Sequence, residues 1–189
     1  TRSHILELES RVKPEDAACM IFTSGTTSLP KGILLSHEQL INNSRAMVEA
    51  MHWGASDKMC ITVPLFHCFG ITAGVIACIT GGMDMCLIPY FRTAHVWDAI
   101  EKYECTILNG VPSMFLALIR KPQYAQRKAP KLKSGIIAGS PCTPEDFLEI
   151  CRRFPHMHLQ PSYGQTETSP CIAIADWDDP NEVKAVSAG

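Results

Sequence analysis

Short runs of apolar residues recur along the chain and alternate with longer stretches of helical character. The apolar runs have the length and β-branched content of strands, and they cover residues 17–23, 59–63, 83–88, 105–108, 134–138 and 157–160. Their apolarity is continuous rather than alternating, which predicts strands that are covered on both faces. Strands of this kind are typical of a largely parallel sheet.

The stretches between these runs carry helix-start signals. Residues 36–39 have the spacing of a capping box, and Thr143 precedes a proline and two acids that suit the first turn of a helix. Pro112 predicts a further helix start that leads into residues 113–120, and residues 71–80 form an apolar helix. The polar residues 121–133 are expected to form a surface loop. Strand, helix and strand in repetition predict an α/β fold with a largely parallel sheet flanked by helices.

Composition places the chain among ordinary globular proteins. It has 189 residues, of which 46% are hydrophobic and 19% charged, so one domain with a sizeable core is expected. The formal net charge of -2 supplies no basic surface for nucleic acid, and small molecules are the expected partners. The chain begins at Thr1, which suggests a piece of a longer protein.

Cysteines and the longest apolar stretch bear on the cellular compartment. The nine cysteines form no C-x-x-C pair and lie mostly within apolar runs, so they are interpreted as reduced thiols of a cytoplasmic protein. Residues 71–89 are interrupted by glycines and by Asp84, so no transmembrane segment is expected. Peripheral association with a membrane stays open.

A loop rich in hydroxyl groups follows the first apolar run. Residues 23–32 read TSGTTSLPKG, and their hydroxyls, glycines and lysine suit a polyphosphate. The nucleotide-binding candidates in this loop are Thr23, Ser24, Gly25, Thr26, Thr27 and Lys31. A P-loop of the Walker type needs glycine directly before the lysine and a hydroxyl directly after it, and Pro30 and Gly32 occupy those places. A Walker-type phosphotransferase is therefore disfavoured.

A second polar segment, YGQTE, occupies residues 163–167. Tyr163 offers a flat face for an adenine ring, and Thr166 offers a hydroxyl for the α-phosphate. Glu167 offers a carboxylate for Mg²⁺, with Thr26 as a further candidate ligand. Gly164 and Gln165 complete the segment as nucleotide-binding candidates.

Together the two segments resemble the signature loops of the adenylate-forming (AMP-binding) enzymes, which include acyl-CoA synthetases, adenylation domains of peptide synthetases, and luciferases. The chain is most similar to a fatty acyl-CoA synthetase, and Ser28 stands where that family usually has glycine. The resemblance implies that a carboxylic acid reacts with ATP to give an acyl-adenylate, which coenzyme A then converts into a thioester. It also implies ATP or AMP and Mg²⁺ as ligands.

Three weaker segments resemble family turns near the substrates, and they lie at residues 64–70, 110–112 and 138–141. By that resemblance His67 lies near the carboxylate as a donor or gate, and Lys31, His67, Thr166 and Glu167 form the catalytic set. The turn at residues 138–141 adds Gly139, Ser140 and Pro141 to the nucleotide site. The acyl pocket then comprises Phe66, His67, Phe69, Gly110 and Gly139, and the apolar helix predicted at residues 71–80 is expected to line a hydrophobic tunnel for a fatty acid.

The resemblance runs from residue 12 to residue 189 and corresponds to the central part of a family member's large N-terminal domain. Residues 1–16 are expected to lead in as a linker or helix, and residues 17–189 to form an incomplete AMP-binding subdomain. The ribose-binding aspartate and late catalytic lysine of the family are not found after Glu167, so the chain alone is expected to be inactive in ATP-pyrophosphate exchange. An aryl or amino acid substrate, a carrier-protein thiol, and a non-catalytic nucleotide-binding relative stay open as alternatives.

Overall fold

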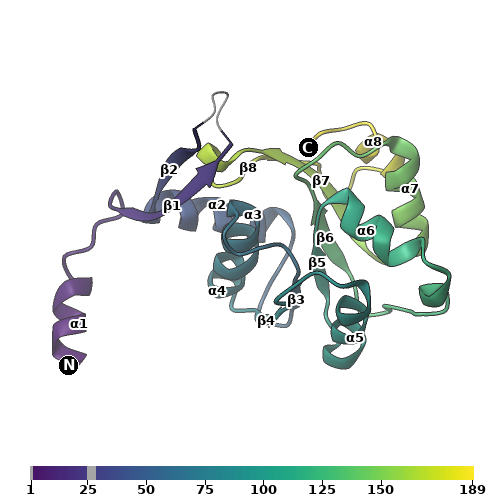
Figure 1. Cartoon of the computed structure of the whole chain (residues 1–189), viewed down its shortest axis with the longest axis horizontal. Helices are drawn as coiled ribbons and strands as arrows, with labels where there is room; N and C mark the ends of the chain where they lie inside the picture. Colours follow the sequence, from purple (N-terminus) through teal and green to yellow (C-terminus); the bar gives the residue numbers. More distant parts are fainter. Residues whose placement is uncertain (1, 25–28) are drawn as a thin grey trace.

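A six-stranded sheet forms the centre of the molecule in the computed structural model, which describes residues 2–24 and 29–189 (Figure 1). The strand order is β4-β3-β5-β6-β7-β8, and every neighbouring pair is parallel except β7 and β8. The strands are β3 (Lys58–Ile61), β4 (Asp84–Leu87), β5 (Ile107–Asn109), β6 (Ser134–Ile137), β7 (His158–Gly164) and β8 (Cys171–Ile174). The predicted α/β class and largely parallel sheet are confirmed.

Helices cover both faces of this sheet and create two cores (Figure 1). One face carries α5 (Thr93–Tyr103), α6 (Pro112–Ile119) and α7 (Pro144–Arg153), whose buried side chains include Trp97, Phe115 and Phe147. The other face carries α2 (His37–Ala50), a π-helical segment η1 (Ile71–Ile76) and α4 (Ala77–Gly81). Shorter elements are α3 (Cys68–Gly70), η2 (Pro122–Tyr124), η3 (Thr166–Thr168) and α8 (Asn181–Lys184).

The helix starts follow the local signals in the sequence. Gln39 N donates to Ser36 Oγ over 3.2 Å and Ser36 N donates to Gln39 Oε1 over 2.8 Å, so the predicted capping box of α2 is confirmed. Thr143 accepts from Asp146 N at the start of α7. Pro112 opens α6 as expected, and residues 121–133 connect α6 to β6 with one short turn.

The first strand departs from its predicted surroundings. β1 (Ala17–Thr23) has the expected bounds, but it pairs antiparallel with β2 (Lys31–Ser36) in a separate hairpin. Ile21 is buried, whereas the outward-facing Met20 and Phe22 are exposed. The expectation that this run is a strand covered on both faces is therefore wrong, because an apolar run does not reveal which of its faces the same chain covers.

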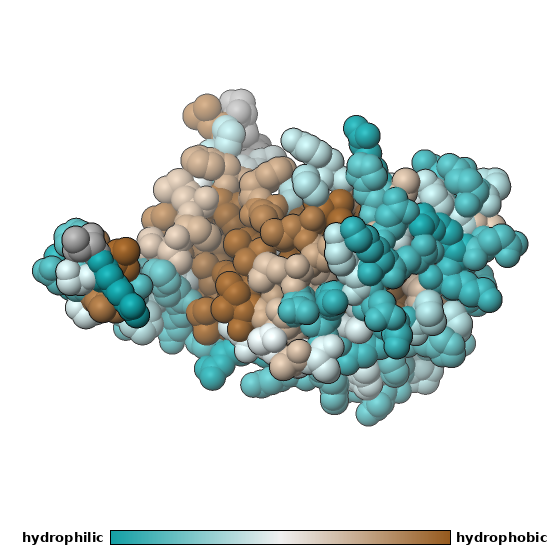
Figure 2. Space-filling model, turned by 90° about the horizontal axis from the view of Figure 1, so that it is seen from below, coloured by the Kyte–Doolittle hydropathy of each residue, from teal (hydrophilic) through white to brown (hydrophobic). Residues whose placement is uncertain are grey.

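Apolar surface is also visible on the main body. β4 lies at the edge of the sheet, where Met85 and Leu87 are exposed, so continuous apolarity again did not mean burial on both faces. Figure 2 shows a broad apolar area on one face of the molecule, bordered by polar side chains. Helix α1 (Arg2–Glu9) buries none of its residues and lies apart from the sheet in Figure 1. Within the described residues, no helix has the length and apolarity needed to cross a membrane.

Candidate functional site

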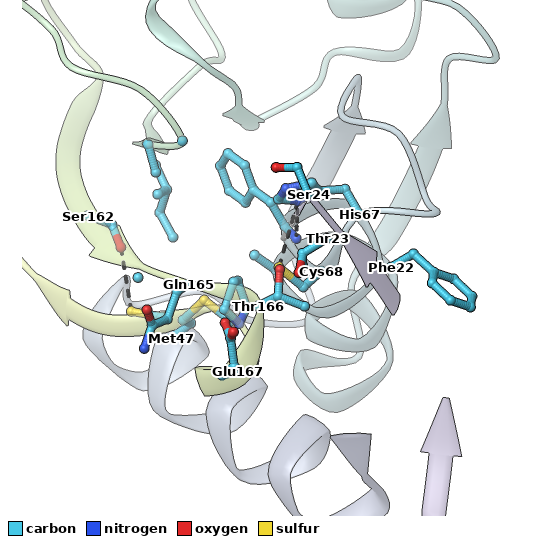
Figure 3. Close-up of a pocket in the computed structure, with 18 residues that line it drawn as sticks. Phe22, Thr23, Ser24, Met47, His67, Cys68, Ser162, Gln165, Thr166 and Glu167 are labelled. Carbon is cyan, nitrogen blue, oxygen red and sulfur yellow. Dashed lines mark hydrogen bonds between the residues drawn. The ribbon is translucent and has the colours of Figure 1, made fainter. Parts of the chain in front are cut away.

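A pocket of about 510 Å³ opens at the carboxyl ends of the parallel strands, where α/β sheets usually bind ligands. It joins segments that are far apart in sequence: the end of β1, the turn before α3, the ends of β6 and β7, and the turn η3 (Figure 3). The predicted site residues that line it are Thr23, Ser24, His67, Phe69, Gly139, Gly164, Gln165, Thr166 and Glu167.

Hydroxyl groups and a carboxylate are part of the lining of this pocket. Thr23 and Ser24 reach it from the end of β1, while Thr166 and Glu167 reach it from η3. Glu167 is exposed, and its carboxylate makes no hydrogen bond or ion pair with the residues that the structure describes. Gly25, Thr26 and Thr27, which sequence reasoning assigned to this site, lie outside the described residues.

Lys31 lies beside the pocket and not in its lining. It is exposed at the start of β2, where it is the cross-strand partner of Thr23. β2 in turn packs against η3, which carries Glu167. The lysine and the carboxylate therefore stand on neighbouring elements on one side of the molecule.

His67 lies at the mouth of the pocket with one ring nitrogen already engaged. Its Nδ1 accepts a hydrogen bond from Phe69 N over 3.1 Å and so caps the short helix α3. An accepting Nδ1 carries no proton, so the neutral ring carries its proton on Nε2. Partial burial lowers the pKa of His67 and favours this neutral form. The imidazole is consequently a hydrogen-bond donor through Nε2.

The inner wall of the pocket is apolar, and the sequence predicts part of it, namely Phe69 and the apolar helix at residues 71–80. Met47 of α2, Ala73 of η1 and Ile136 of β6 are buried and line it together with Cys171. Cys68, also in the lining, lies between His67 and Thr166 in Figure 3. Met47 follows Leu40 and Ser44 on the buried stripe of α2, and that helical spacing is the one signal that could have indicated its inward direction.

A second pocket, of about 740 Å³, lies on the other side of the ends of β6 and β7 and shares Gly139 and Gly164 with the first. Ser140, Pro141 and Tyr163 line it, all predicted as nucleotide-binding residues. The Tyr163 side chain is 54% exposed, so its ring is accessible for stacking. The nucleotide-binding candidates are thus divided between two adjoining pockets.

The loop between the two pockets is held by close backbone packing. A Cβ atom at Gly164 would lie 1.6 Å from the carbonyl oxygen of Pro170, so β7 and β8 approach each other at a position that only glycine fits. Asn43 of α2 makes two hydrogen bonds with the backbone of Cys171. Its Nδ2 donates to Cys171 O over 2.7 Å, and its Oδ1 accepts from Cys171 N over 3.2 Å. These contacts fix the backbone beside Thr166 and Glu167.

Two predicted acyl-pocket residues lie elsewhere. Phe66 is 83% exposed and is not part of the lining of either pocket. Gly110 lies in a small internal cavity beside Met114 and Phe115. The other three members of that predicted group, His67, Phe69 and Gly139, line the first pocket.

Candidate metal ligands do not cluster in the described part of the chain. Among the described residues, no group of three or more His, Cys, Asp or Glu side chains is arranged to hold a metal ion. Among the described residues that line the first pocket, Glu167 carries the one carboxylate. Such a donor set suits Mg²⁺ that arrives with a polyphosphate, because Mg²⁺ usually takes one or two carboxylates and completes its shell with phosphate oxygens and water.

Comparisons with known proteins identify relatives of the chain. The family model described as AMP-binding enzyme matches residues 3–189. A putative acyl-CoA synthetase, YngI, from Bacillus subtilis is 41% identical over 169 residues, which cover 88% of this chain and 31% of that protein. The human medium-chain acyl-CoA ligase ACSF2, named as mitochondrial, is 34% identical over 197 residues, covering 100% of this chain and 32% of the relative.

Solved structures share the fold. The N-terminal domain of FACL13 from Mycobacterium tuberculosis, in an inhibitor-bound crystal structure, superposes with a TM-score of 0.81 at 22% identity, covering 95% of this chain and 46% of that one. The chain spans about a third of the length of the curated relatives that it matches.

Proposed function

Because the chain belongs to the AMP-binding enzyme family, we propose that it supplies the nucleotide- and acyl-binding pocket of an AMP-forming acid-thiol ligase. In the first half-reaction a carboxylate attacks the α-phosphorus of ATP, forming an acyl-adenylate and releasing pyrophosphate. In the second, the thiol of coenzyme A attacks the acyl carbon, forming a thioester and releasing AMP.

The observation that carries this proposal is the mixed lining of the first pocket. Thr23, Ser24 and Thr166 bring hydroxyl groups to that lining, and Glu167 brings a carboxylate. Met47, Ala73 and Ile136 bring buried apolar side chains. A site that joins a carboxylic acid to a triphosphate needs both surfaces, because the anionic groups react where the apolar tail of the acid is already bound.

Glu167 is the residue that would hold Mg²⁺ in this site, since its carboxylate is exposed and unpaired among the described residues. The ion, when bound with ATP, supplies charge neutralisation for the attack of one anion on another. The hydroxyl of Thr166 donates a hydrogen bond to an oxygen of the α-phosphate, and Lys31 contributes positive charge from the adjacent strand.

His67 acts on the acid rather than on the nucleotide. Its Nε2–H donates to a carboxylate oxygen and orients the other oxygen towards phosphorus, because Nδ1 is committed to Phe69 N. The second pocket takes the adenine ring, which stacks on Tyr163 beside the turn at Gly139, Ser140 and Pro141. The shared rim at Gly164 then lies where the base and the phosphates join.

We propose a fatty acid of medium length as the substrate. The inner wall includes the apolar side chains of Met47, Ala73 and Ile136, and none of these three offers a charged group to an amino acid. The name of the human relative, a medium-chain acyl-CoA ligase, supports the same class. All nine cysteines are free, which favours a reducing compartment such as the cytoplasm or, as the name of that relative prints, the mitochondrion.

The test is an ATP-pyrophosphate exchange assay on the full-length protein with fatty acids of graded length, aryl acids and amino acids. We expect exchange with fatty acids of medium length, and thioester formation when coenzyme A is added. Glu167→Gln should lower exchange at least about 100-fold, because it removes the carboxylate that binds the ion. Glu49→Gln, at an exposed position of α2 outside both pockets, is the matched control. Absence of exchange with every acid would refute the ligase proposal.

A further inference from the structure

Cys68 lies at the point where two segments of the first pocket meet. It begins helix α3 directly after His67, and its side chain is 1% exposed. Its Sγ lies 3.7 Å from Thr166 Oγ1 and 3.7 Å from His67 Nδ1. The thiol therefore contacts both polar groups that the proposed reaction uses on this side of the pocket (Figure 3).

The thiol has one proton and two neighbours that could accept it. His67 Nδ1 already accepts from Phe69 N at 3.1 Å, so its single lone pair is occupied. Thr166 Oγ1 makes no other hydrogen bond within the described residues and has two lone pairs available. The Cys68 proton therefore goes to Thr166.

The protonation state of Cys68 supports a hydrogen bond that its Sγ donates to Thr166 Oγ1. Burial raises the pKa of the Cys68 thiol, which keeps the sulfur protonated at neutral pH. A protonated, buried thiol is a poor nucleophile, and the same proton makes it a hydrogen-bond donor. Cys68 is therefore placed to orient a neighbour and not to react with substrate.

We propose that Cys68 is a positioning residue that fixes the hydroxyl of Thr166 for the α-phosphate. By donating to one lone pair of Oγ1, the thiol directs the hydroxyl proton of Thr166 away from the protein and into the pocket. Thr166 is buried, and its own proton meets no acceptor among the described residues, so it is free to donate to a phosphate oxygen. This inference rests on the proposed function of the same pocket.

The test is a double-mutant cycle on the full-length protein with Cys68→Ala, Thr166→Ala and the double variant. We expect Cys68→Ala to lower kcat of ATP-pyrophosphate exchange about three- to tenfold, the range of one net hydrogen bond, with less than a twofold change in the KM for ATP. In the Thr166→Ala background the same change should lower kcat less than about twofold, because the partner is gone. Cys68→Ser, which keeps a donor, should recover most of the loss.

Cys78→Ala is the matched control, because Cys78 is also fully buried but lies in α4 outside both pockets. The positioning role would be overturned if Cys68→Ala had the kcat of the wild type. It would also be overturned if Cys68→Ala lowered kcat equally with and without the Thr166 hydroxyl. Should the wild-type protein show no exchange with any acid, the ligase proposal fails, and the hydrogen bond is then tested by itself through the infrared S–H stretch of Cys68, assigned by difference from Cys68→Ala, in the wild type and in Thr166→Ala. An S–H frequency that does not change when the Thr166 hydroxyl is removed overturns the inference independently.

Discussion

Gly164 offers a sharp test of how the fold positions the candidate site. It ends β7, pairs with Cys171 of β8, and lines both pockets directly before the turn that carries Thr166 and Glu167. A Cβ atom built there would lie 1.6 Å from Pro170 O, 2.7 Å from Pro170 C and 3.1 Å from Cys171 Cα. All three are backbone atoms, so no side-chain rotation can relieve the contact.

The size of the effect of Gly164→Ala follows from this geometry. The strands must separate by roughly 1.4 Å before the Cβ atom reaches even the shortest tolerated approach to the Pro170 carbonyl oxygen, and overpacking of this kind costs about 1 to 3 kcal/mol. A displacement of about 1 Å in a catalytic group lowers a rate by about 100-fold. We therefore expect exchange activity to fall by about 100-fold, while the protein is destabilised but still folds.

The assay compares Gly164→Ala with Gly54→Ala in the full-length protein. A Cβ atom at Gly54 meets nothing within 4 Å, so this variant controls for the loss of glycine itself. Circular dichroism and the midpoint of urea unfolding report folding, and ATP-pyrophosphate exchange reports the site. If Gly164→Ala retained the activity and stability of Gly54→Ala, the close approach of β7 and β8 would not be what holds the loop.

Two further predictions concern a histidine and a buried amide. Burial lowers the pKa of His67 below the ordinary histidine value of 6.5, so the ring is still neutral at pH 6.5. We therefore expect kcat of exchange to stay constant from pH 7.5 to pH 6.5 and to decline only at lower pH, when a protonated Nδ1 can no longer accept from Phe69 N. His67→Asn should lack this decline. Gln160 is fully buried in β7, and neither atom of its amide has a hydrogen-bond partner among the described residues, so Gln160→Met should stabilise the protein by about 1 to 3 kcal/mol in urea unfolding. A lower midpoint for Gln160→Met would show that the amide is hydrogen-bonded in solution.

Local signals in the chain were sufficient for much of the fold. The capping box at Ser36, the N-cap at Thr143 and the proline at Pro112 each produced the expected helix, because these interactions involve residues within one turn of each other. Elements without such signals, among them α5 and the strands β2 and β8, were not predicted. β2 and β8 are short strands stabilised mainly by antiparallel partners, which a pattern of apolar residues does not reveal.

In the candidate site, too, residues that belong to local motifs were predicted and residues without such motifs were not. Thr23, Ser24, His67, Thr166 and Glu167 were chosen by their chemistry and by their motifs, and the structure brings them to one pocket. The roles assigned to them stay predictions. Ala73 belongs to the apolar stretch at residues 71–80 that was expected to line a hydrophobic tunnel, and it does line the pocket. Met47 and Ile136 were missed, because they come from two other elements and share no local pattern with that stretch.

The sequence by itself determined the chemical groups, the starts of α2, α6 and α7, and the strand-helix alternation, since each depends on residues that are near one another along the chain. Only the tertiary structure decided that the hairpin stands apart from the main sheet, that the nucleotide-binding candidates divide between two pockets, and that Cys68 contacts Thr166. The physical reason is that these features depend on which surfaces meet when distant segments pack. That outcome is set by the shape and burial of the whole molecule and not by any one segment.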